Sequence, residues 1–128
     1  MARIILLVED DRTLREALAE GFSCDGHTVH QAGHGAEALK LLADGCRPGI
    51  ILLDILMPVM DGVRFLELKN EDALLAHIPV IVMSATEREA LAGVAQLLSK
   101  PLDFAELESA IGRHYAPPSP QDRTATGG

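Results

Sequence analysis

Short strand-like runs alternate along the chain with segments in which apolar residues recur at helical spacing. The runs at 4–8, 50–53 and 79–83 are almost wholly apolar, whereas those at 28–32 and 96–99 are mixed. A continuous apolar run of this length is typical of a strand covered on both faces, and a mixed run of a half-exposed strand. Helical patterns follow the strands and carry Leu14, Leu18, Phe22, Ala38, Leu42, Val63, Leu66, Phe104, Leu107 and Ile111. Five strand-helix units in a row predict an α/β fold, a parallel sheet with right-handed crossovers and helices on both faces.

Several helix ends are also marked in the sequence. Either Asp11 or Thr13 can cap the first helix, since residues 13–16 have the form of a capping box. A short helical piece is expected between Thr86 and about Gly93. The 128 residues are enough for one core. We therefore expect one domain over residues 1–115, followed at 116–128 by a Pro-, Ser- and Gly-rich flexible tail or the start of a linker.

The charge balance excludes some classes of protein. Lys and Arg number 11 against 19 Asp and Glu, giving a net charge of −8, and aromatic residues make up only 3%. Such a chain lacks the basic patch and the stacking rings that nucleic-acid binding needs, so we expect no DNA binding by this chain. No apolar stretch is long enough for a membrane span or a signal peptide. We expect a cytoplasmic protein without a membrane partner.

Polar side chains stand where four of the five strands end. Glu9 and Asp10 follow the first strand, Asp54 the third, Ser84 the fourth and Lys100 the fifth. Each alone has an ordinary structural explanation, such as a helix cap or a solvated charge. Together they converge, because ligands of an open parallel sheet bind at the carboxyl ends of its strands. Three neighbouring carboxylates repel one another unless a cation lies between them, and oxygen-only ligands favour a hard ion such as Mg²⁺.

These motifs resemble the receiver domain of two-component response regulators, in particular the chemotaxis-like receivers. The resemblance covers about residues 3–115. It implies a flavodoxin-like doubly wound sheet of five parallel strands in the order 2-1-3-4-5. The motifs that carry it are IILLVEDD (4–11), LLDILMP (52–58) with MDG (60–62), VMSA (82–85) and KP (100–101).

The resemblance also implies a role for each residue. Asp54 is the phosphoacceptor that becomes an aspartyl phosphate in a Mg²⁺-dependent phosphorelay reaction. Lys100 pairs with a phosphoryl oxygen, and Ser84 donates its hydroxyl to another. The peptide bond between Lys100 and Pro101 is expected to be cis. The implied Mg²⁺ ligands are Glu9, Asp10, Asp54 and the backbone carbonyl of Leu56.

The implied phosphoryl donor is a sensor histidine kinase or a histidine phosphotransfer protein. An unidentified downstream protein would then read the phosphorylated receiver through altered protein–protein contacts. We expect the chain not to be an enzyme in the usual sense, since it would catalyse only its own phosphoryl transfer and dephosphorylation.

Two features depart from the family pattern. Leu97 stands where receivers usually carry an aromatic switch residue, and the stretch from Ser84 to Lys100 is shorter than usual. We therefore expect a shortened fourth helix. We also expect phosphorylation to change the order of residues 85–96 rather than one side-chain rotamer.

Other readings account for the sequence less well, with one exception. The alternative that remains is a receiver fragment of a larger hybrid kinase or multidomain regulator. A phosphohydrolase with an aspartyl-phosphate intermediate would need an Asp two residues after the nucleophile, where Leu56 stands. A degenerate scaffold would have a broken acidic pocket. A flavin-binding flavodoxin would have a phosphate loop after the first strand.

Overall fold

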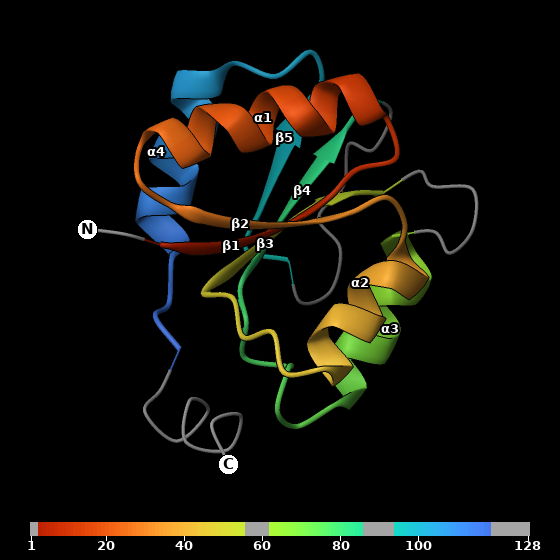
Figure 1. Ribbon diagram of the computed structural model, residues 1–128. Helices are drawn as coiled ribbons and strands as arrows, with labels where there is room; N and C mark the ends of the chain where they lie inside the picture. Colours follow the sequence, from red (N-terminus) through yellow and green to blue (C-terminus); the bar gives the residue numbers. More distant parts are fainter. Residues whose placement is uncertain (1–2, 56–61, 86–93, 119–128) are drawn as a thin grey trace.

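Five parallel strands form one sheet, and the helices of the described residues pack against both of its faces (Figure 1). The computed structural model describes residues 3–55, 62–85 and 94–118. Strand order is β2-β1-β3-β4-β5, which confirms the order implied by the sequence. The elements are β1 (Ile4–Val8), α1 (Arg12–Cys24), β2 (Thr28–Ala32), α2 (Gly35–Ala43), β3 (Ile50–Asp54), α3 (Gly62–Glu71), β4 (Val80–Ser84), β5 (Gln96–Ser99) and α4 (Phe104–His114).

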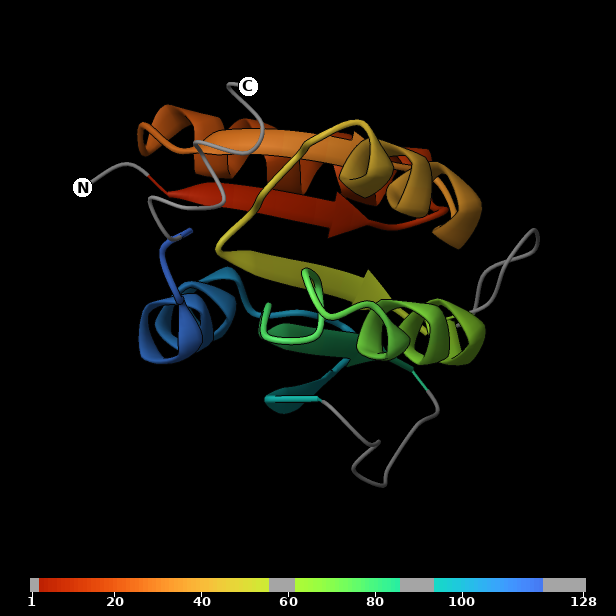
Figure 2. The same ribbon diagram turned by 90° about the horizontal axis from the view of Figure 1, so that it is seen from below.

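The sheet separates two hydrophobic layers. Alternate residues of β1 point to opposite faces, so that Ile5 and Leu7 pack against α1 and α4 while Leu6 and Val8 pack against α2 and α3. The three central strands are almost fully buried and the outer strands β2 and β5 are partly exposed, as the mixed sequences of 28–32 and 96–99 predict. Figure 2 shows the sheet between these two layers from a second direction.

The turn from β1 into α1 takes only three residues. Asp11 is the N-cap of α1, and its Oδ1 accepts the backbone N–H of Leu14 at 3.1 Å. The alternative cap, Thr13, is wrong because Thr13 lies inside the first turn of the helix. The short connection leaves Glu9 and Asp10 at the carboxyl edge of the sheet, where the sequence placed the candidate site.

The chain after α4 returns to the opposite edge of the sheet. The hydroxyl of Tyr115 accepts the backbone N–H of Ile4 at 2.9 Å, and the N–H of Ala116 donates to the carbonyl of Gly49 at 3.1 Å. A side chain at Gly49 would overlap the Tyr115 ring, because a Cβ there would lie 2.4 Å from the ring carbon Cζ. The start of β1 is thus fastened to the end of the last helix.

Two further expectations concern the segment around β5. The bond between Lys100 and Pro101 is cis, as predicted. The short helix expected at 86–93, between β4 and β5, lies outside the described residues. The expectation that this helix is shortened therefore stays a prediction.

Candidate functional site

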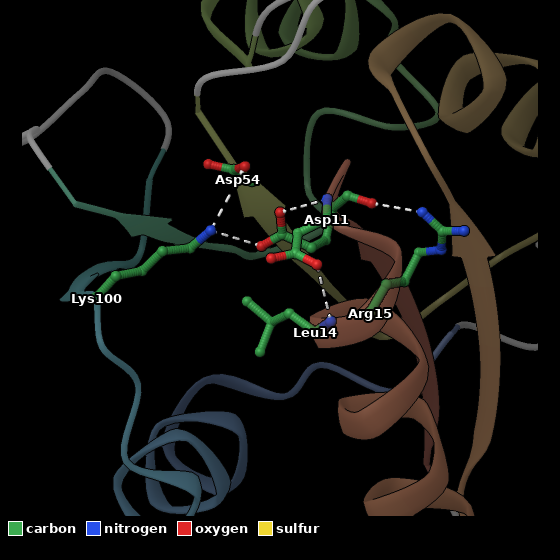
Figure 3. A network of polar contacts seen from close by, with 6 residues as sticks. Asp11, Leu14, Arg15, Asp54 and Lys100 are labelled. Carbon is green, nitrogen blue, oxygen red and sulfur yellow. Dashed lines mark hydrogen bonds and ion pairs between the residues drawn. The ribbon is translucent and has the colours of Figure 1, made fainter.

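Four strands bring polar side chains to the carboxyl edge of the sheet. Asp54 ends β3 and pairs in register with Met83, and the next residue of β4 is Ser84. Ser84 in turn pairs with Ser99, directly before Lys100. Glu9 follows β1 from the other side of β3. The sheet order alone therefore brings these residues to one edge of the sheet, and Figure 3 shows the side chain of Lys100 directed towards Asp54.

Three carboxylates form the core of the site. Glu9, Asp10 and Asp54 each offer an oxygen within 4.8 Å of the others. Glu9 is fully buried, Asp54 is 5% exposed and Asp10 is open to solvent. Burial raises the pKa of Asp54 to about 7, with the neighbouring Glu9 and Asp10 acting in the same direction. The site thus holds more negative charge than its surroundings stabilise.

Lys100 is the positive group facing these acids. Its Nζ lies 2.7 Å from Oε1 of Glu9 and 3.6 Å from Oδ2 of Asp54. Burial alone would lower the pKa of this ammonium, but the two carboxylates outweigh it and the net effect raises the pKa. Lys100 therefore remains charged at neutral pH and partly balances the acidic cluster.

Every polar atom of Glu9 has a partner. Its Oε2 accepts the N–H of Asp11 at 3.1 Å, and its own N–H donates to the carbonyl of Ala32 at 3.0 Å. Its carbonyl accepts Nη1 of Arg15 at 2.8 Å. Glu9 is therefore the most firmly held residue of the site, fixed by β2, α1 and the residue after β5.

The acidic edge also depends on a close approach between β3 and α3. The N–H of Gly62 donates to the carbonyl of Ile55 at 2.8 Å. A Cβ on Gly62 would lie 2.7 Å from Cα of Ile55 and 3.1 Å from the carbonyl oxygen of Asp54. The absence of a side chain at Gly62 therefore lets α3 start directly against the end of β3.

The residues singled out from the sequence have different outcomes. Glu9, Asp10, Asp54 and Lys100 come together as expected. Ser84 is buried at the end of β4, and its carbonyl accepts the N–H of Lys100 at 2.9 Å. The carbonyl of Leu56 lies outside the described residues and stays a prediction. The partly buried Leu97 packs against the core layer formed with α2 and α3.

Sequence reasoning missed two supporting residues. The sequence marks Arg15 only as part of a capping box, and Gly62 only as the last residue of the MDG motif at 60–62. No pattern along the chain shows that the Arg15 guanidinium reaches back to the Glu9 carbonyl. The approach of Gly62 to β3 depends on tertiary packing, which its place in the MDG motif does not reveal.

A parallel sheet in this order, with a lysine-paired acidic cluster at its carboxyl edge, defines a receiver-like class of protein. Residues 5–112 match the family model described as the response regulator receiver domain. The chain is also 37% identical over 116 residues to the regulatory protein AtoC of Escherichia coli, covering 85% of this chain and 24% of AtoC. It spans less than half the length of several curated relatives.

Solved structures give the same result. One is the signal receiver domain of a signal transduction histidine kinase from Syntrophus aciditrophicus, with a TM-score of 0.79, 29% identity and coverage of 87% of this chain and 88% of that one. Another is the response regulator TrrA from Thermotoga maritima in complex with Mg²⁺-BeF, with a TM-score of 0.77, 26% identity and coverage of 87% and 97%.

This chain belongs to the response regulator receiver domain family. It is a phosphorylatable signalling receiver with the flavodoxin-like fold, as its motifs predicted. Among the helices of the described ranges, none has the length and hydropathy required to cross a membrane.

Proposed function

We propose that Asp54 is the residue of this chain that accepts the phosphoryl group. The observation that carries the proposal is its position at the end of β3, between two other carboxylates and 3.6 Å from the ammonium of Lys100. A carboxylate oxygen of Asp54 forms the new bond to phosphorus while the bond from phosphorus to a donor histidine nitrogen breaks. That nitrogen keeps the electron pair of the broken bond, and the histidine leaves as a neutral imidazole because its other ring nitrogen carries a proton.

The acidic cluster fits a resident Mg²⁺ ion. All of its donors are carboxylate oxygens, which suit a hard divalent cation, and three of them lie within 4.8 Å of one another. Glu9, Asp10 and Asp54 would hold the ion, and the predicted fourth ligand is the carbonyl of Leu56. When bound, the ion supplies neutralising charge for the transferring phosphoryl group.

Two neighbouring residues are suited to hold the phosphoryl oxygens. Lys100 places a charged ammonium beside Asp54, and Ser84 brings a hydroxyl to the end of the adjacent strand. We assign Lys100 to pairing with one phosphoryl oxygen and Ser84 to donating a hydrogen bond to another. Phosphoryl transfer relies on such positioning and charge stabilisation rather than on further covalent chemistry.

The partners follow from this chemistry. The donor is a phosphohistidine on a sensor histidine kinase or a phosphotransfer protein in the cytoplasm, and a downstream protein reads the modified surface. We assign the chain no activity beyond its own phosphorylation and dephosphorylation. We place the receiver in residues 1–115 and a linker or tail from 116.

A phosphorylation assay on four proteins tests the proposal. The wild type, Asp54→Asn, Asp10→Ala and Asp44→Asn are incubated with acetyl phosphate, with and without Mg²⁺, and weighed by intact mass spectrometry. We expect one added phosphoryl group in the wild type and in Asp44→Asn, because Asp44 is an exposed residue that caps the far end of α2 through its backbone N–H, which the substitution keeps. Asp54→Asn should gain none and Asp10→Ala little. Full modification of Asp54→Asn, or modification of the wild type without Mg²⁺, would contradict the proposal.

A further inference from the structure

An arginine supports the acidic cluster from behind. Arg15 lies one turn into α1 and donates from Nη1 to the carbonyl oxygen of Glu9 at 2.8 Å. Figure 3 draws this hydrogen bond as the dashed line that ends on the guanidinium of Arg15. The same nitrogen would lie 3.4 Å from a Cβ built on Gly33, directly after β2. The guanidinium therefore fills the space between the end of β1 and the chain leaving β2.

The contact falls where the sheet can no longer fix the backbone. The N–H of Glu9 makes a ladder-like bond to Ala32, the last residue of β2. The next peptide group joins Glu9 to Asp10, whose side chains are two of the three carboxylates of the site. Its carbonyl is the atom that Arg15 holds. A bond to a charged guanidinium is stronger than one between neutral groups, so this peptide is held against rotation.

Arg15 keeps this position although its own donors are not all used. Among the described residues, Nε of Arg15 is buried and has no hydrogen-bond partner. A buried donor without a partner opposes folding. The contact between Arg15 and Glu9 is therefore kept although burial of the Nε donor opposes folding. This is expected of a residue whose role is to fix the position of the Glu9–Asp10 backbone.

We propose that Arg15 is a positioning residue of the acidic site, which fixes the Glu9–Asp10 peptide so that both carboxylates lie within reach of Asp54. This inference rests on the proposed Mg²⁺ site. Among the described residues, the Arg15 guanidinium hydrogen-bonds to none of the carboxylate oxygens and acts through the backbone carbonyl of Glu9. Groups that orient metal ligands typically change metal affinity by about 10- to 100-fold when removed.

Arg12 provides a matched control on the same helix. It carries the same charge three residues earlier, but its side chain is 80% exposed and pairs with Glu16 at 2.9 Å. Removing Arg12 therefore removes the same charge without touching Glu9. A difference between the two arginines measures position rather than net charge.

The test is a calorimetric Mg²⁺ titration of the wild type, Arg15→Met, Arg15→Lys and Arg12→Met at one pH and salt concentration. Arg15→Met should raise the dissociation constant for Mg²⁺ by about tenfold or more. Arg15→Lys, which keeps a charged donor, should recover most of this loss, and Arg12→Met should stay within about twofold of the wild type. Raising the Mg²⁺ concentration should also restore the phosphorylation rate of Arg15→Met, which a general loss of structure would not allow.

Three outcomes would overturn the inference. If Arg15→Met binds Mg²⁺ with wild-type affinity, Arg15 has no positioning role. If Arg12→Met loses as much Mg²⁺ affinity as Arg15→Met, the effect is one of net charge rather than of position. A wild type that does not bind Mg²⁺ contradicts the proposed site itself and the inference with it. If Arg15→Met does not fold, Arg15→Gln replaces it, because glutamine keeps a polar side chain but is too short to reach Glu9. Wild-type Mg²⁺ affinity in Arg15→Gln would contradict the inference in the same way.

Discussion

Replacing Asp54 with asparagine should stabilise the chain in the absence of divalent ions, and more so at pH 8 than at pH 5. The reason is the burial of Asp54, which together with the neighbouring Glu9 and Asp10 raises its pKa to about 7. Asparagine has nearly the same shape and cannot ionise. The charge conflict disappears with the substitution while the packing is kept.

The sign follows from proton binding. In the unfolded chain Asp54 has its ordinary pKa of 3.8, so between about pH 4 and pH 7 the folded chain holds a proton that the unfolded chain has released. The free energy of unfolding of the wild type therefore falls as the pH rises through this window. At about 1.4 kcal/mol per pH unit, the shift in the pKa of Asp54 lowers the free energy of unfolding by about 4 kcal/mol over the whole window. Between pH 5 and pH 8 the free energy of unfolding falls by about 2–3 kcal/mol.

Urea unfolding of both proteins in the presence of EDTA measures this difference. The stability advantage of Asp54→Asn should grow by about 2–3 kcal/mol from pH 5 to pH 8. Asp44→Asn, at an exposed position, should differ from the wild type by the same small amount at both pH values. Adding Mg²⁺ at pH 8 should stabilise the wild type more than Asp54→Asn, so that the difference in stability between the two proteins becomes smaller. An advantage that is equal at the two pH values would refute the reasoning.

Three further predictions follow from other parts of the molecule. Gly62→Ala should destabilise the fold by about 1–3 kcal/mol in chemical unfolding, because its Cβ would collide with Ile55; unchanged stability would contradict the close approach. Burial lowers the pKa of Lys69 to about 8, so the wild type should gain stability relative to Lys69→Met as the pH rises from 8 to 10.5; parallel curves would contradict it. Hydrogen exchange with beryllofluoride, a phosphoryl mimic, should change across residues 85–96 because Leu97 is a packed aliphatic residue rather than a mobile ring; changes confined to Asp54 and Ser84 would contradict this.

The fold could be predicted because its signals are local and consistent. The apolar runs at 4–8 and 50–53 correspond to central strands, and the mixed run at 28–32 to an edge strand. The convergence of Glu9, Asp54 and Lys100 follows once the strands are parallel, because each residue ends or follows a strand. The strand order and the cis bond before Pro101 came only from the resemblance of the motifs.

The details that the sequence did not reveal depend on side-chain direction. Asp11 and Thr13 were equally acceptable caps until the start of α1 was known. Arg15 resembles any exposed helix residue in the sequence, and only the path of its side chain brings it to Glu9. The raised pKa of Asp54 similarly depends on burial and distance, which spacing along the chain cannot give.

The account depends most directly on the identity of the phosphorylated atom. An aspartyl phosphate is an acyl phosphate, and borohydride reduces it to homoserine. After phosphorylation with acetyl phosphate and Mg²⁺, reduction and peptide sequencing by mass spectrometry should find homoserine at position 54 and at no other aspartate. Homoserine at Asp10 or Asp11, or a phosphoryl group that survives reduction on another residue type, would contradict the central claim.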